Sequence, residues 1–103
     1  MQHELYANPS SRTRRSFPFI VVMQSDIVDT ETRLVAPLGL NVPPLAGTPN
    51  RALPAVRHEG ADYIVAPPHF GTLMNLHLRR PLGSLREFRD DLTRALDWIF
   101  FGI

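Results

Sequence analysis

The hydrophobic pattern changes its period near residue 84, and this change restricts the possible fold more than any other feature of the sequence. Before it, short apolar segments separated by Gly, Pro, Asn and Ser favour extended strands. After it, apolar residues recur at intervals of three and four, which is typical of a helix with one face on a sheet. The sequence therefore predicts strands first and one helix last.

Six segments in the first part of the chain have the pattern of strands. They are residues 4–6, 17–23, 33–38, 55–58, 63–66 and 72–78. Residues 39–54 contain two glycines and four prolines, so we expect a long connection with at most one helical turn. Residues 59–62 include Gly60 and favour a hairpin between the fourth and fifth strands.

We expect the helix to begin at Ser84. Ser84 and Glu87 have the spacing of a capping box, in which each side chain bonds a free backbone N–H at the helix start. An apolar stripe follows, formed by Leu85, Phe88, Leu92, Ala95, Leu96 and Ile99. Gly102 can adopt the positive φ that ends a helix. The expected fold is mainly β, a small antiparallel barrel or curved sheet closed by one C-terminal α-helix.

Length and composition limit the classes of function. A chain of 103 residues fits one domain, residues 1–103. The net charge of +1 is too small to indicate non-specific nucleic-acid binding, and the absence of cysteine excludes disulfides and thiolate metal sites. No stretch approaches the roughly 20 apolar residues of a membrane span, and residues 1–4 lack the start of a signal peptide. We expect a cytoplasmic protein that does not bind membranes.

The C-terminal end has more large apolar residues than one helix face can bury. Trp98, Ile99, Phe100, Phe101 and Ile103 point in nearly every direction around the helix axis. Aromatic rings left in water would form a patch of the size that marks an interface, whereas the alternative is that all of them fill the core or a dimer seam. Ile27 and Val28 form a second apolar pair inside a polar loop, which indicates another contact surface.

Catalytic and metal-binding constellations are weak in this sequence. Asp26 and Asp29 could act as paired carboxylates, but near a strand exit such residues more often satisfy turn backbone groups. The histidines are scattered and have no ligand spacing: His3, His58, His69 and His77. We therefore expect no catalytic residue, no metal and no cofactor.

All eleven basic residues are arginine, and three of them lie close together in the first connection. Arg12, Arg14 and Arg15 could grip a phosphate or an acidic peptide, because guanidinium groups bind such oxyanions with two parallel hydrogen bonds. The alternative is a solvated loop with no ligand.

The run Val22 to Thr30, with the sequence VMQSDIVDT, and the strand Arg33 to Leu38 resemble the signature stretch of the CcdB toxins of the ccd toxin–antitoxin system. The beginning of the chain, the segment 53–56, the helix and the final Gly102-Ile103 occur in the same order and at similar separations. The resemblance therefore covers essentially the whole chain.

This resemblance implies an SH3-like β-barrel with a C-terminal helix, a homodimer, and a toxin that binds the A subunit of DNA gyrase and traps the gyrase–DNA cleavage complex. It also implies neutralisation by a CcdA antitoxin, plasmid maintenance, and transcription regulation in which operator DNA is bound only indirectly, through the antitoxin complex. The implied gyrase-binding residues are Ile27, Val28, Asp97, Phe100, Phe101, Gly102 and Ile103. For the antitoxin we nominate Arg12, Arg14 and Arg15.

Two residues depart from the best-known family member, and two other functions stay open. Phe101 replaces a Trp and loses its indole N–H, while Asp97 replaces an Asn and adds charge. One alternative is a family member that no longer poisons gyrase and serves as an antitoxin-binding, operon-regulating module. The other is an endoribonuclease similar to MazF, for which the sequence offers no convincing acid–base pair.

Overall fold

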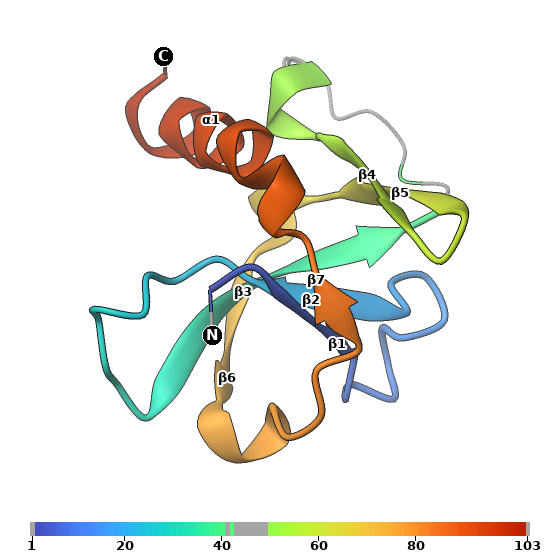
Figure 1. The fold of residues 1–103 in the computed structure, drawn as a ribbon, viewed down its shortest axis with the longest axis vertical. Helices are drawn as coiled ribbons and strands as arrows, with labels where there is room; N and C mark the ends of the chain where they lie inside the picture. The colour runs from blue at the N-terminus through green and yellow to red at the C-terminus, as the bar shows by residue number, and fades with distance from the viewer. Residues whose placement is uncertain (1, 41, 43–49, 103) are drawn as a thin grey trace.

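The computed structural model describes residues 2–40, 42 and 50–102. Its strands are β1 (Glu4–Ala7), β2 (Phe19–Val22), β3 (Thr32–Gly39), β4 (Ala55–His58), β5 (Ala61–Val65), β6 (Gly71–Met74) and β7 (Gly83–Ser84). One helix, α1 (Arg89–Phe101), follows them, and Figure 1 shows it above the sheet with the β4–β5 hairpin at its side. Short 3-10 turns lie between these elements: η1 (Asn50–Ala52), η2 (Pro67–His69), η3 (Asn75–His77) and η4 (Arg86–Phe88).

The strands form one antiparallel sheet with β3 at its centre. The order is β4-β5-β3-β2-β1-β7, and β6 also pairs with β3. One edge of β3 pairs with β2, and the other pairs with β6 over residues 32–35 and with β5 at Leu38 and Gly39. Because β3 shares that edge between two strands, the sheet bends into a nearly closed barrel. The predicted fold class, mainly β with one C-terminal helix, is confirmed.

Both faces of the sheet are apolar, because successive residues of a strand point to opposite sides. In β2, Val21 belongs to a core cluster that also contains Leu92 of α1, whereas Ile20 and Val22 belong to a second cluster. The first cluster comprises Leu5, Val21, Met23, Ala36, Leu38, Val56, Val65, Leu85 and Leu92. The second comprises Tyr6, Ile20, Val22 and Val35, with Leu73 and Leu78 packed against it. The helix therefore covers one face only.

The β4–β5 hairpin has a tighter turn than the sequence suggested. His58 pairs directly with Ala61, so the turn consists of Glu59 and Gly60 alone. Both residues have positive φ, 49° and 78°, the combination that a two-residue type I′ turn requires. The predicted hairpin is thus confirmed, and the loop between its strands is two residues long.

The last predicted strand is half as long as its alternating pattern suggested. Strand β6 ends at Met74, and residues 75–77 form η3 instead. The backbone N–H of Asn75 still donates to the Glu31 carbonyl, in register with β3, and its side-chain amide donates to the Thr30 carbonyl. The Asn75 carbonyl then accepts the N–H of Leu78, so the chain turns into η3. The Asn75 side chain thus binds the β2–β3 loop, a contact that the alternation of apolar and polar residues in the sequence could not reveal.

The predicted capping box does not form. Ser84 belongs to β7 and pairs with Glu4, and the next residue, Leu85, donates its N–H to the His3 carbonyl. The Ser84 hydroxyl accepts a bond from the backbone N–H of Arg86 at 3.2 Å, and α1 begins at Arg89 without a side-chain cap. Pairing in the sheet therefore takes the backbone of Ser84 away from the helix start.

No helix in the described ranges is long and apolar enough to cross a membrane.

Replacement of Leu92 by Ala tests the docking of α1 on the sheet. Leu92 is fully buried in the first core cluster, so Leu92→Ala should lower the free energy of unfolding by about 2–5 kcal/mol. Urea unfolding followed by circular dichroism measures the change. The exposed neighbour provides a control, because Thr93→Ala should change stability by less than about 0.5 kcal/mol. Equal losses in the two variants would contradict this packing.

Candidate functional site

The end of α1 presents aromatic side chains to solvent. Phe100 is 54% exposed and Phe101 is 72% exposed, whereas Trp98 and Ile99 are half-buried. The ring of Phe100 packs edge-on against Phe70 with centroids 5.8 Å apart, and the Phe101 ring lies 6.5 Å from that of Phe100. Phe100 is thus supported from behind, while Phe101 projects furthest. We name Phe100, Phe101 and Gly102 the α1-end surface.

Gly102 sets the direction in which the chain leaves the helix. It has φ 72°, and its N–H donates to the Trp98 carbonyl at 2.8 Å. This left-handed conformation favours glycine, and the predicted helix stop is confirmed. Among the described residues, no atom of another segment lies within 4 Å of the place where a Cβ at Gly102 would stand. Asp97 is half-buried one turn earlier, and Ile103 lies outside the described residues.

The loop between β2 and β3 presents Ile27 and Val28. Ile27 is 91% exposed and Val28 is 49% exposed, so neither side chain is buried in the core. The side chain of Gln24 holds the loop from inside, because its amide donates to the Val28 carbonyl and the Thr30 hydroxyl, both at 2.9 Å. Its carbonyl oxygen accepts the backbone N–H of Leu34. Polar contacts made by Gln24 therefore hold the apolar pair at the surface.

The two aspartates of this loop have separate structural partners. Asp26 accepts a hydrogen bond from the backbone N–H of Gln2 at 2.7 Å, and Asp29 pairs with Arg33 at 3.3 Å. Their carboxylates thus fix the loop to the N-terminal segment and to β3. In the part of the chain that the structure describes, no group of three or more His, Asp or Glu side chains could hold a metal ion.

The structure does not bring the two apolar surfaces together within one chain. Figure 1 shows the β2–β3 loop, drawn in cyan, and the end of α1, drawn in red, at separate places along one side of the view. Segments that are apart in projection are also apart in space. A partner that contacts both surfaces must therefore be large or must meet two copies of the chain.

The three loop arginines lie far from the end of α1. Arg12, Arg14 and Arg15 are exposed in the connection between β1 and β2, at the other side of the sheet in Figure 1. Asn8 shapes this loop through bonds to the Phe17 carbonyl and to the Thr13 hydroxyl. Arg12 also lines a surface pocket of ≈ 470 Å³ together with apolar residues of β2 and β3.

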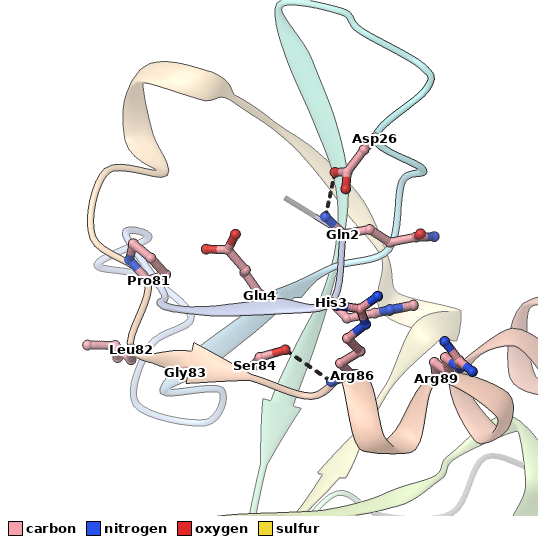
Figure 2. Close-up of a pocket in the computed structure, with 10 residues that line it drawn as sticks. All are labelled: Gln2, His3, Glu4, Asp26, Pro81, Leu82, Gly83, Ser84, Arg86 and Arg89. Carbon is pink, nitrogen blue, oxygen red and sulfur yellow. Dashed lines mark hydrogen bonds between the residues drawn. The ribbon is translucent and has the colours of Figure 1, made fainter.

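A polar pocket that the sequence did not reveal lies between the start of β1 and the start of α1. Its volume is ≈ 660 Å³, and Figure 2 shows the side chains around it. The lining residues are Gln2, His3, Glu4, Asp26, Pro81, Leu82, Gly83, Ser84, Arg86 and Arg89. The sequence contained no signal for this site, because its residues come from three distant segments and match no known spacing.

His3 is the most constrained residue of this pocket. It is only 9% exposed and has φ 66°, which is uncommon for a residue with a side chain. Burial lowers the pKa of His3 below its ordinary 6.5, and the charge of Arg89 lowers it further, whereas Asp26 opposes the shift. The imidazole is therefore mainly neutral at pH 7.

Comparison with known protein families shows to which family this chain belongs. The profile of the family described as "CcdB protein" matches residues 2–102. The chain belongs to the CcdB family. A search of curated proteins found no match. The barrel-like sheet and the single C-terminal helix agree with the CcdB fold, and membership of the family indicates a toxin of the ccd system.

The lowered pKa of His3 predicts that acid destabilises the protein. Between the folded and unfolded pKa values of His3 the unfolded chain binds more protons, so the free energy of unfolding falls as pH decreases through 6.5. In His3→Asn this contribution disappears, and Asn tolerates positive φ. Urea unfolding from about pH 7.5 to 5.5 and an NMR titration of the ring measure the effect. A ring pKa at or above the ordinary value would contradict the prediction.

Proposed function

We propose that this protein is a toxin that binds the A subunit of DNA gyrase through the α1-end surface and traps the gyrase–DNA cleavage complex. The observation that carries the proposal is the exposure of Phe101 beside Phe100 at the end of α1, in a member of the CcdB family. Aromatic side chains left in water at a chain end act as anchors when a partner covers them.

Binding alone is sufficient for this activity. A protein that binds one conformation of gyrase more tightly than the others increases the population of that conformation, without making or breaking a bond. The carboxylates that could have served acid–base chemistry, Asp26 and Asp29, are engaged with Gln2 and Arg33. These contacts favour a binding protein over an endoribonuclease similar to MazF.

The magnitude of the apolar contact is adequate for a stable complex. A Phe side chain has about 150–250 Å² of surface, and 54% of Phe100 and 72% of Phe101 are still exposed, so burial of that part at about 25 cal/mol per Å² contributes a few kcal/mol for each ring. A homodimer would present two such ends to a two-fold symmetric enzyme, and both could bind at once. We therefore propose that the active species is a homodimer.

Phe101, the proposed aromatic anchor, and the nearby Asp97 differ from the residues of the best-known family member. Phe101 keeps a large apolar ring, so the gyrase contact rests on burial of that ring and loses only the indole hydrogen bond. Asp97 is half-buried one turn earlier, and its charge must face a polar or basic group of gyrase. Ile27 and Val28 supply a second apolar contact on a loop that Gln24 holds in place.

Removal of the anchor should abolish poisoning without unfolding the protein. Phe101→Ala, Gly102→Glu, and deletion of residues 102–103 should each reduce the amount of gyrase-cleaved DNA at least tenfold, because an interfacial aromatic anchor contributes about 2 kcal/mol or more. A cleavage assay with purified gyrase and plasmid DNA measures the effect. Circular dichroism and analytical ultracentrifugation should show a folded dimer in every case.

A matched control separates the anchor from general loss of apolar surface. Leu40 is exposed beyond the opposite end of β3 from the Ile27 loop, so Leu40→Ala should leave cleavage unchanged. Full activity of the Phe101 and Gly102 variants would contradict the proposed site. Cleavage of RNA by the purified protein without gyrase would instead favour the endoribonuclease, and harmless expression in gyrase-proficient cells would favour the regulatory module.

We further propose that Arg12, Arg14 and Arg15 bind a CcdA-type antitoxin. All three guanidinium groups are exposed, and within the described residues none of them forms an ion pair. They lie on a different part of the molecule from the α1-end surface (Figure 1), so the antitoxin could remain bound while that surface is engaged. Guanidinium groups of this kind suit acidic side chains of an antitoxin.

Replacement of all three arginines by Gln should uncouple neutralisation from toxicity. The triple variant should still arrest growth, because the α1-end surface is unchanged. A CcdA-type antitoxin that neutralises the unmodified toxin should bind the variant at least tenfold more weakly and fail to rescue growth. Isothermal titration and co-expression measure the two effects. Normal rescue of the triple variant would remove these arginines from the antitoxin site.

A further inference from the structure

We propose that the polar pocket between the start of β1 and the start of α1 binds a carboxylate side chain of a peptide, held by the guanidinium groups of Arg86 and Arg89 beside the imidazole of His3. This site is distinct from the α1-end surface, which lies at the other end of α1. The proposal therefore does not depend on gyrase binding.

Two unused guanidinium groups define the basic side of the pocket. Arg86 stands in η4 and Arg89 is the first residue of α1, so a single helical turn carries both. Among the described residues neither guanidinium group forms an ion pair or a hydrogen bond. Figure 2 shows both side chains rising toward the level of His3. Paired guanidinium groups with free donors are suited to one oxyanion.

His3 adds an imidazole that lines the pocket. The residue is 9% exposed, and no hydrogen bond to its ring nitrogens occurs within the described residues. No fully buried side-chain nitrogen lacks a partner in the part of the chain that the structure describes, so these ring nitrogens are open to the pocket, where a bound group can reach them. The left-handed backbone of His3 directs the ring there, while its N–H and carbonyl remain bonded to Val22 and Leu85.

The side of the pocket away from the two arginines carries negative charge, and this charge favours one class of anion over another. The carboxylates of Asp26 and Glu4 also line it, and Figure 2 shows them away from the two arginines. These carboxylates repel a phosphate dianion about twice as strongly as a singly charged carboxylate, and they repel every charge along a nucleic-acid backbone, so a single carboxylate that meets Arg86 and Arg89 is favoured. A peptide can in addition place a basic side chain near Asp26. The geometry therefore favours a peptide with an acidic residue next to a basic one.

The test uses the whole protein and the probe acetyl-Glu-Lys-amide. Titration into ¹⁵N-labelled protein at constant ionic strength should shift the amide signals of residues 2–4, 26 and 83–89. The His3 ring signals should also move toward the protonated form, because a bound carboxylate beside the imidazole raises its pKa. Arg86→Gln and Arg89→Gln should each weaken binding about tenfold, the usual loss for a charge-assisted hydrogen bond.

Matched controls remove the effects of net charge and of folding. Arg94→Gln removes the same charge from α1, but Arg94 pairs with Asp91 at 3.9 Å and does not line this pocket, so binding should be unchanged. Acetyl-Gln-Lys-amide, which lacks only the carboxylate, should not bind. Arg86 and Arg89 are exposed, so their replacement should leave the amide spectrum of the core unaltered.

Three outcomes would overturn the proposal. The first is equal binding of the Glu and Gln peptides, and the second is equal weakening by Arg94→Gln. The third is tighter binding of inorganic phosphate than of the Glu peptide, which would assign the pocket to phosphate. Loss of gyrase poisoning in Phe101→Ala with intact peptide binding would show that the two surfaces act independently.

Discussion

The antiparallel pairing of β3 is the interaction on which the rest of the structure depends. This strand pairs with β2 along one edge and with both β5 and β6 along the other, so it links all parts of the sheet. Its alternate residues belong to different apolar clusters: Ala36 and Leu38 lie in the first core cluster, which α1 covers, and Val35 lies in the second, on the opposite face. Phe100 and Phe101 at the end of α1 belong to neither cluster and stay exposed.

The surfaces proposed for binding stand where the sheet ends. The β2–β3 loop is stiffened by Gln24, whose amide and carbonyl bridge its two sides, so Ile27 and Val28 stay outside the core. At the end of α1, Gly102 closes the helix in a left-handed conformation directly after Phe101. The braced loop and the helix end thus hold Ile27, Val28 and Phe101 at the surface, although burial of these apolar side chains in the core would be more favourable.

Much of the fold could be read from hydrophobic period and turn chemistry. The apolar stripe of α1, the β4–β5 hairpin and the stop at Gly102 were predictable because each depends on neighbouring residues. The failures concern Ser84 and Asn75. Both have partners distant in sequence, Ser84 in β1 and Asn75 in the β2–β3 loop, and those contacts outweighed the local pattern. The surplus of aromatic residues at the C-terminus correctly indicated exposed rings, whereas their role in binding gyrase is a proposal that family membership supports.

The sequence by itself determined which residues alternate between faces, where the helix ends, and that one helix face cannot bury every large apolar residue at its end. These properties follow from backbone geometry over a few residues. Only the tertiary structure decided that His3, Asp26 and Arg86 surround one pocket, because the pairing of β1 with β7 brings the segment before α1 beside the start of the chain. It also decided that the Ile27 loop and the α1-end surface stand apart, as Figure 1 shows, because one lies at an end of the sheet and the other at the end of the helix packed on it.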